Sequence, residues 1–463
     1  MHIDEANFLM LTQGSFLYPH NVLVNWQGST ERAFDVLSNP AGIAWLLWPL
    51  KDWDPMWMRL GMFPWFVLLL YGVDRLGQVF SDSRGFLVLL TLFSPAVFIH
   101  IGSLTPDIPL IAIYITGFSG VCLSRDWRWA LLAGFSVFFR YSGLTVIPLI
   151  LAWSVIFGHT RTGIKLSLVA CIPFFVLTCY DFWAYGQSHF VHMITFQSSE
   201  SSPWVLKLIS IFAMLSGAVV LPWFSFDRHG TISVVLSIGI TFGVFSFVHQ
   251  LTDVLWVLSG VFLTLNTVRI DNKRGLFLSI WMIGGLVFLS QLRFSAARYW
   301  LPFFFPILLM LIQGKKFRSK LVLLSTTSIL SIFLLIDDYR FALAHRDAAH
   351  TVQQRYDSGI FAGHWGWQHY LQGENWISAE DDMILPKNTV FARINTAWPQ
   401  EVQGCKVLLE EFSSPSFGLP RVHTHQGKAN IHSSHIYNVG MVFSPWSFGE
   451  DPYVHVQLFR TCP

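Results

Sequence analysis

Two adjacent carboxylates near the start of the chain, Asp4 and Glu5, have the chemistry of an acid–base site. A carboxylate held in a partly dry site beside a membrane is a suitable general base, because it can take a proton from an attacking hydroxyl group. A structural interpretation stands beside this one, since acids at an interface also cap helices or remain in water. These two residues alone leave both interpretations open.

A second acid, Asp107, follows Thr105 and Pro106 in a short polar break between two uncharged apolar runs. An aspartate at this position is also favoured at the start of a helix, by capping geometry and by the helix dipole. Asp107 is therefore either a helix cap or an active-site acid, and the two roles are compatible.

Three arginines stand next to tyrosine or aromatic residues at the ends of apolar runs. They are Arg140, which precedes Tyr141, and Arg293 and Arg298, of which the second precedes Tyr299. Guanidinium groups bind phosphate oxygens through two hydrogen bonds and stay charged, so these residues predict a phosphate site. The alternative is that the arginines extend toward lipid headgroups, as arginines near the ends of membrane helices often do.

The composition of the 463 residues places most of the chain in lipid. Hydrophobic residues make up 53% and charged residues 13%, against about 45–50% and about 25% in soluble chains. No basic face of the kind that binds nucleic acid is present in the sequence. Twelve apolar runs approach the roughly 20 residues of a membrane-spanning helix, and they cover about 60–80, 86–103, 108–124, 129–139, 142–157, 164–184, 205–224, 231–248, 252–268, 275–291, 299–313 and 320–336.

Basic residues concentrate in alternate breaks between these runs, which predicts the orientation of the chain. Cytoplasmic loops carry the excess of Lys and Arg. The first acidic loop, the Asp107 turn, residues 186–204 and everything after Asp337 are then expected on the outer side of the membrane. The breaks expected in the cytoplasm contain Arg75, Arg84, Arg125, Arg128, Arg161, Lys165, Arg228, Arg269, Lys273, Arg274, Lys315, Lys316, Arg318 and Lys320.

Three domains follow from this pattern: a first outer loop with the acidic motif (1–55), a transmembrane helical domain (56–337) and a soluble C-terminal domain on the outer side (338–463). Strand-like runs at 389–394 and 406–411 predict that the last domain is α/β or rich in β-structure. Within it, Cys405 and Cys462 either form a disulfide in an oxidising compartment or remain free.

Paired histidines in the C-terminal domain, His423 with His425 and His432 with His435, have spacings seen in metal ligands. No cysteine or acidic cluster accompanies them, so the sequence favours a polar surface.

Taken together, the acid-led first loop, Thr105-Pro106-Asp107 and Phe139-Arg140-Tyr141 resemble the GT-C class of lipid-linked-sugar glycosyltransferases. The similarity is to the protein O-mannosyltransferase and aminoarabinose transferase branch, and it covers about residues 1–370. The resemblance implies a polytopic bacterial inner-membrane enzyme. It would transfer a sugar with inversion from a polyprenyl-phosphate donor to a glycan, lipid or protein acceptor on the periplasmic side.

The resemblance also implies roles for particular residues. Asp4 corresponds to the catalytic acid, with Glu5 as a neighbour that tunes it and Asp107 as a second acid facing the same site. Many relatives carry a lysine where this chain has Asn39, so Lys51 or Arg59 would have to supply that phosphate contact. No cofactor is certain. A divalent cation between the acids remains open, because hard cations bind carboxylates.

In the resembling family a transmembrane helix precedes the acidic pair, which gives thirteen crossings rather than twelve. We therefore expect such a helix upstream of the sequence given; a short N-terminus translocated after insertion is the alternative.

Two other classes of protein remain as alternatives, a transporter and a non-catalytic membrane subunit. A transporter is expected to carry ionisable residues near the middle of its spans, often in repeated halves. The acids here lie at the ends of the runs.

Overall fold

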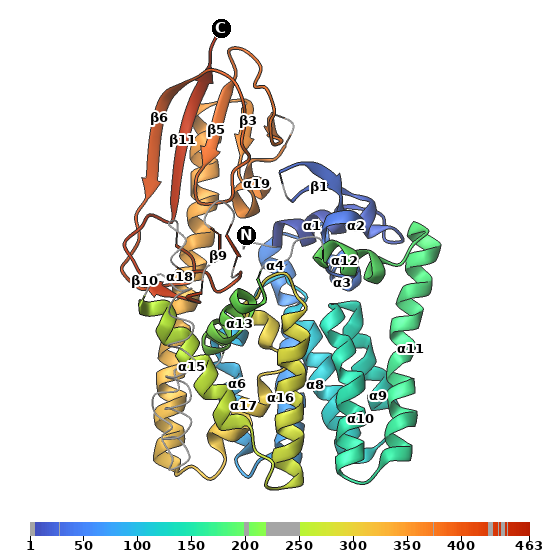
Figure 1. Ribbon diagram of the computed structural model, residues 1–463. Coiled ribbons are helices and arrows are strands. Elements are labelled where there is room, and N and C mark those ends of the chain that lie inside the picture. The colour runs from blue at the N-terminus through green and yellow to red at the C-terminus, as the bar shows by residue number, and fades with distance from the viewer. Residues whose placement is uncertain are drawn as a thin grey trace.

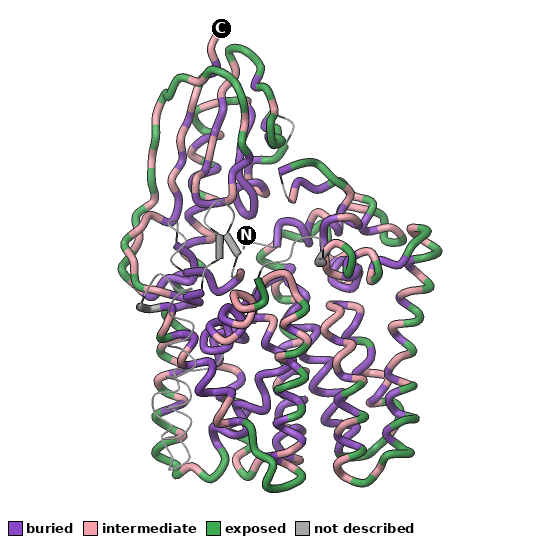
Figure 2. The backbone as a smooth tube through the Cα atoms, in the orientation of Figure 1, coloured by how far each residue is buried: buried purple, intermediate pink, exposed green. Residues whose placement is uncertain are grey.

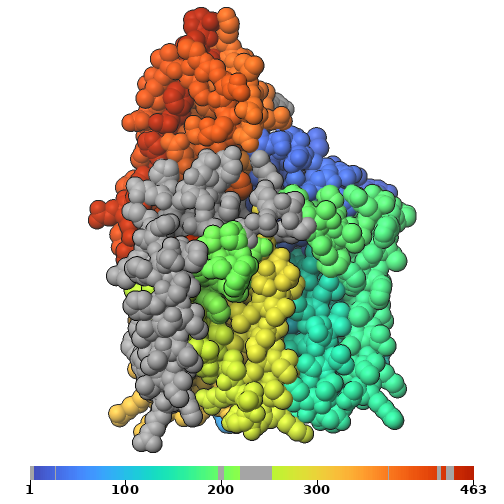
Figure 3. Space-filling view, viewed as in Figure 1, coloured from blue at the N-terminus to red at the C-terminus, as the bar shows by residue number. Residues whose placement is uncertain are grey.

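The computed structural model describes residues 5–26, 28–198, 203–218, 251–373, 375–424, 429–433, 435–436, 440–441 and 443–463. An upright helix bundle carries a layer of short helices and a β-sheet domain at one end (Figure 1). The sheet domain projects above the bundle, with the first loop against its side (Figure 3). Asp4, the residue predicted to be the general base, and Arg228 lie outside the described residues.

The first loop folds into short elements that lie over the end of the bundle. They are α1 (Glu5–Gln13), η1 (Pro19–Asn21), the hairpin strands β1 (Leu23–Asn25) and β2 (Thr30–Arg32), α2 (Ala33–Val36), α3 (Gly42–Leu47) and η2 (Trp48–Leu50). The β-hairpin reaches the C-terminal domain, where Asn25 Nδ2 donates to Ala379 O at 2.9 Å and Asp381 N donates to Gly28 O at 2.7 Å. Gly28 is required there, because its φ is +98° and a Cβ would lie 1.8 Å from Asp381 Oδ2.

The bundle and its outer end contain most of the remaining helices, several of them interrupted. They are α4 (Pro55–Leu60), α5 (Phe63–Phe80), α6 (Arg84–Leu92), α7 (Pro95–Phe98), α8 (Asp107–Ser124), α9 (Trp127–Gly134), η3 (Phe135–Phe138), η4 (Tyr141–Thr145), α10 (Val146–Ile156), α11 (Thr160–Tyr185), α12 (His189–Ser198), α13 (Trp204–Ala218), α15 (Leu251–Thr267), α16 (Lys273–Ser290), η7 (Ala297–Trp300), α17 (Phe305–Ile312) and α18 (Phe317–Arg355). Helix α12 lies at the outer end beside the first loop (Figure 1).

Five helical stretches among the described residues are long and apolar enough to cross a membrane: 55–80, 107–124, 160–185, 273–290 and 317–355. Three shorter apolar helices cover 141–156, 204–218 and 253–267. Large apolar side chains such as Leu168 and Phe175 on α11 point outward, as expected of a surface that faces lipid. Figure 2 shows the buried residues in the middle of the bundle and exposed turns at its lower end.

The predicted twelve crossings are not visible as twelve long helices. The run at 86–103 is divided into α6 and α7, because Pro95 lacks the amide hydrogen that would continue α6. The run at 299–313 is divided into η7 and α17, and the run at 231–248 lies outside the described residues. The expected helix break at Arg140 is present: Arg140 has extended backbone angles (φ −156°, ψ 148°) between η3 and η4.

Helix α8 is the most buried of the five long stretches and forms the centre of the bundle. It packs closely against α9 at Gly117, where a Cβ would lie 2.4 Å from Ala133 N. The basic breaks 81–84, 125–128, 157–161, 269–274 and 313–318 lie at the end of the bundle opposite the sheet domain (Figure 1). Within the described part of the chain, these basic breaks therefore lie at the end opposite the Asp107 turn and the C-terminal domain; Arg75 lies inside α5 rather than in a break.

The C-terminal domain is an α/β structure around a five-stranded mixed sheet with the order β4-β3-β5-β11-β6. Helix α18 continues without a break across the predicted boundary at 337/338, and its outer half packs with α19 on the core of the sheet. The predicted strands at 389–394 and 406–411 are confirmed as β5 and β6, and Cys405 and Cys462 form a disulfide. The elements are β3 (Gly359–Ala362), α19 (Trp365–Leu371), β4 (Trp376–Ser378), β5 (Val390–Ile394), β6 (Lys406–Ser414), β7 (Pro420–Arg421), β8 (His435–Ile436), β9 (Gly440–Met441), β10 (Ser447–Phe448) and β11 (Val454–Thr461).

Candidate functional site

The connection between α7 and α8, residues 99–106, is the place where the predicted site residues meet; we call it the outer turn. Pro95 and Asp107 mark the starts of the two helices that it joins. In the middle of the outer turn, Leu104 N donates to Glu5 Oε1 at 2.8 Å, and Gly102 O accepts from Arg59 Nη1 at 2.5 Å. The first loop and α4 therefore both bind the backbone of this turn.

Glu5 and Arg59 form an ion pair with two hydrogen bonds, Nη1 to Oε1 at 2.5 Å and Nη2 to Oε2 at 2.7 Å. The Glu5 carboxylate is fully buried, whereas the Arg59 side chain is 32% exposed. Such a two-point pair fixes the plane of the carboxylate. The structure thus gives Arg59 a protein partner, where the sequence offered it as a substitute phosphate ligand.

Asp107 forms an ion pair with Arg140 at the end of the outer turn, and both side chains are largely buried. Its second oxygen, Oδ2, is buried without a hydrogen-bond partner among the described residues. The Arg140 guanidinium lies over the Tyr299 ring at 4.4 Å, and the Arg298 guanidinium lies 5.6 Å from the same ring. Two guanidinium groups therefore surround one carboxylate and one tyrosine.

Tyr141 connects this cluster to α12. Its hydroxyl lies 2.8 Å from His189 Nδ1, while His189 Nε2 lies 3.0 Å from Leu37 O. A carbonyl oxygen only accepts, so Nε2 carries the proton and Nδ1 accepts the hydrogen bond from the Tyr141 hydroxyl. Tyr141 thus has a structural partner in this arrangement.

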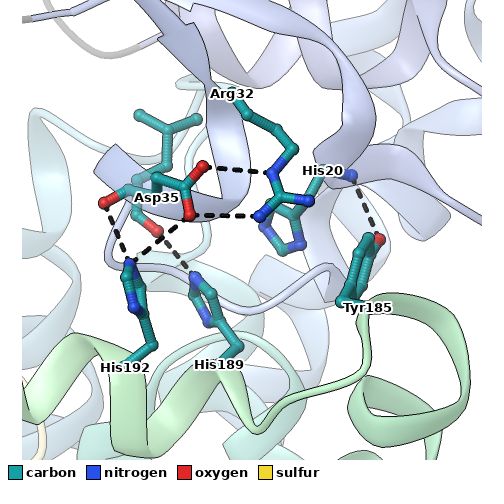
Figure 4. A network of polar contacts seen from close by, with 7 residues as sticks. His20, Arg32, Asp35, Tyr185, His189 and His192 are labelled. Atoms are coloured by element: carbon teal, nitrogen blue, oxygen red, sulfur yellow. Dashed lines mark hydrogen bonds and ion pairs between the residues drawn. The ribbon is translucent and has the colours of Figure 1, made fainter.

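Figure 4 shows the wider polar network around His189, in which α12 faces the first loop. Arg32 binds Asp35 through Nε at 3.1 Å, and His192 lies 3.6 Å from the same carboxylate. His20 Nε2 donates to Asn39 O at 3.1 Å, and its ring stacks on His189 with centroids 4.8 Å apart. Burial lowers the pKa of His20 to about 4, so this histidine is neutral near pH 7.

Two other predicted cations lie elsewhere. Lys51 is exposed at the end of η2, where its ammonium group lies 5.0 Å from the Trp48 ring. Arg293 lies half-buried in the loop between α16 and η7, and burial lowers its pKa. The structure therefore brings together two groups along the outer turn: Glu5 with Arg59, and Asp107 with Arg140, Arg298 and Tyr299.

The sequence did not point to the contacts of the C-terminal domain with this site. His423 and His432 are buried, so the prediction of a polar surface is wrong for them; His425 and the side chain of His435 lie outside the described part of the chain. His432 Nε2 lies 3.2 Å from Asp338 Oδ1 on α18. The adjacent acids Asp337 and Asp338, at the end of the last apolar run, were the available signal, because ionisable residues at membrane ends usually have a partner.

No metal site emerges from the parts of the chain that the structure describes, where no group of three His, Cys, Asp or Glu side chains is placed to hold an ion. Glu5 and Asp107 are each neutralised by an arginine. The divalent cation that the sequence left open would lie near Asp4 and Asp107, and Asp4 is outside the described residues, so the cation stays an open prediction.

Comparison with known proteins gave no match to any family model, to any curated protein or to any solved structure.

Proposed function

We propose that this chain is a polytopic glycosyltransferase of the bacterial inner membrane that uses a polyprenyl-phosphate sugar as donor. In this proposal the chain crosses the membrane about twelve times, and the outer turn and the C-terminal domain face the periplasm. The sugar passes with inversion to an acceptor hydroxyl on that side.

The observation that carries this proposal is the cluster of Arg140, Arg298 and Tyr299 around Asp107 at the end of apolar helices. The cluster places two guanidinium groups on one tyrosine ring, and guanidinium groups stay charged and bind phosphate oxygens through paired hydrogen bonds. A phosphodiester with a long apolar tail fits such a place, because its tail remains in lipid while its charge meets arginine.

The reaction is a single displacement at the anomeric carbon. A carboxylate removes the proton from the acceptor hydroxyl, whose oxygen then bonds to the anomeric carbon. The bond from that carbon to the phosphate oxygen breaks on the opposite face, and polyprenyl phosphate leaves with the bonding electrons. Arginines stabilise the charge that develops on the leaving phosphate.

We assign the base to Asp4, which directly precedes the fixed Glu5 in the sequence. Glu5 is held by Arg59 and by the Leu104 amide, so its role is to anchor the start of α1. Asp107 is the second acid. Its pairing with Arg140 orients that guanidinium toward the proposed phosphate position.

Transfer from a radiolabelled polyprenyl-phosphate sugar, in membranes that contain the chain, tests this proposal. We expect Asp4→Asn to lower the rate at least ~100-fold, the usual minimum for loss of a general base. The matched control is Asp347→Asn, which changes an exposed acid on the outer half of α18. It should transfer at the wild-type rate.

The other outcomes are informative. If wild type and Asp4→Asn transfer sugar at the same rate and Asp107→Asn transfers none, the general base is Asp107 and not Asp4. No transfer by wild type from any of several donors would reject the enzyme class. A transporter or a non-catalytic subunit would then be the better interpretation.

A further inference from the structure

A short segment of the C-terminal domain, residues 429–433, enters the outer end of the helix bundle; we call it the docking segment. Its central residue, Ile431, has no exposed surface and belongs to the same hydrophobic core as the bundle helices. Ala297 N donates to Ile431 O at 3.1 Å, and Ile431 N donates to Val422 O at 3.0 Å. The docking segment therefore touches the backbone immediately before Arg298.

The next residue, His432, lies between two buried side chains. Its Nε2 is 3.2 Å from Asp338 Oδ1, and its ring meets the edge of the His100 ring with centroids 5.5 Å apart. A carboxylate accepts, so Nε2 of His432 carries the proton. The exposed fractions of Asp338, His432 and His100 are 5%, 2% and 1%.

His100 belongs to the outer turn, which also contains Leu104 and leads into Asp107. His100 Nδ1 is anchored to Ala96 O at 2.8 Å. His100 lies near the start of the outer turn, seven positions before Asp107 in the chain. The contact between His432 and His100 therefore packs on the outer turn. The same turn donates a hydrogen bond to Glu5 from Leu104 N and is followed directly by Asp107.

We infer that His432, held by Asp338, is a positioning residue through which the C-terminal domain fixes the outer turn and thereby Asp107 and Glu5. The effect of His432 on sugar transfer rests on the proposed function, whereas its effect on the position of the outer turn is independent of that function.

A general anchoring role is supplied by another contact, one residue away on α18. Asp337 binds Arg421 at 3.0 Å, accepts from Tyr453 Oη at 2.8 Å and accepts from Val422 N at 2.9 Å. This cluster joins the C-terminal domain to the bundle without contacting the outer turn through any of these bonds. The pair of Asp338 and His432 is thus the one that reaches toward His100.

Hydrogen exchange of the peptide that covers residues 99–106 tests the inference directly. We expect His432→Ala and Asp338→Ala to speed its exchange roughly tenfold, because the first removes the neighbour of the turn and the second removes the acceptor that holds this neighbour, so the turn opens locally. His432→Gln should restore slow exchange, since its amide N–H replaces the Nε2–H donor. The matched control Glu401→Gln removes an exposed ion pair with Arg393 in the same domain and should change nothing in this peptide.

Unchanged exchange in both His432→Ala and Asp338→Ala, with β5 and β11 still protected, would overturn the inference. If His432→Ala loses protection in β5 and β11 as well, Asp338→Ala decides, because it removes the acceptor and leaves His432 in place. These readouts hold even if wild type transfers no sugar, so failure of the proposed function is recognised separately.

Kinetics then measure the effect on the reaction. In His432→Ala we expect a fall of about tenfold in kcat with KM for the donor changed less than about twofold, because misplaced catalytic groups slow the chemical step more than binding. His432→Gln should recover most of kcat. If both KM and kcat fall in His432→Ala, and His432→Gln restores neither of them, the positioning role is contradicted.

Discussion

Glu5 and Arg59 lie 54 positions apart in the sequence, yet they form an ion pair with two hydrogen bonds beside the outer turn. The pair removes a carboxylate from water completely and leaves its arginine one-third exposed. Removal of one partner from such a pair leaves the other charge uncompensated. Replacement of Glu5 is therefore expected to lower the stability of the fold, although the sequence indicates a chemical role for this residue.

We expect Glu5→Gln to lower the free energy of unfolding by about 3 kcal/mol, the lower end of the range for buried pairs, because Arg59 is partly hydrated. Denaturant unfolding in detergent measures this loss. Glu31→Gln in the same loop is the control, since Glu31 is exposed on β2. Equal unfolding midpoints for the two variants would show that the Glu5 pair contributes nothing.

The first loop and α12 are joined by two stacked histidines, which makes this junction sensitive to pH. Burial lowers the pKa of His20 to about 4 and the pKa of His189 well below its ordinary value. In the unfolded chain both histidines bind a proton below about pH 6.5. The unfolded state thus binds more protons, so stability falls as pH decreases from about 6.5 toward 4, by up to about 1.4 kcal/mol per unit for each histidine.

The test compares unfolding midpoints at several pH values in wild type and in His20→Phe/His189→Phe. The double variant should show a smaller decrease in stability between pH 6.5 and 4, whatever its stability at pH 7. Some decrease will persist, because burial also lowers the pKa of His364 to about 4 and of His423 to about 3. His350→Gln, at an exposed position on α18, should keep the wild-type slope. If stability decreases with falling pH as steeply in the double variant as in wild type, His20 and His189 are not the source of this pH dependence.

The sequence predicts those helix breaks and strands that depend only on the local pattern of apolar and polar residues. The break at Arg140 and the strands β5 and β6 follow from short apolar or alternating runs, and the structure confirms them. Long-range partners depend on packing that no local pattern contains. The sequence therefore indicates neither the Glu5 carboxylate as the partner of Arg59 nor the Asp338 carboxylate as the partner of His432.

At the scale of the whole molecule, the bundle separates a basic end from an end that carries the candidate site and the C-terminal domain (Figure 1). The disulfide between Cys405 and Cys462 adds an independent argument, because disulfides persist in oxidising compartments. Both features favour a C-terminal domain outside the cytoplasm. In the proposed function, the donor would be a lipid-linked sugar on that side of the membrane.

Single cysteines test this orientation. In a background with Cys122, Cys171 and Cys179 replaced by serine, we expect Lys387→Cys in the C-terminal domain to react with a membrane-impermeant maleimide in intact spheroplasts. Lys273→Cys, at the start of α16 on the basic end, should react only after permeabilisation, because basic loops are retained in the cytoplasm. The opposite pattern would place the Asp107 cluster against the cytoplasm. A periplasmic transfer reaction would then be excluded, whichever carboxylate acts as base.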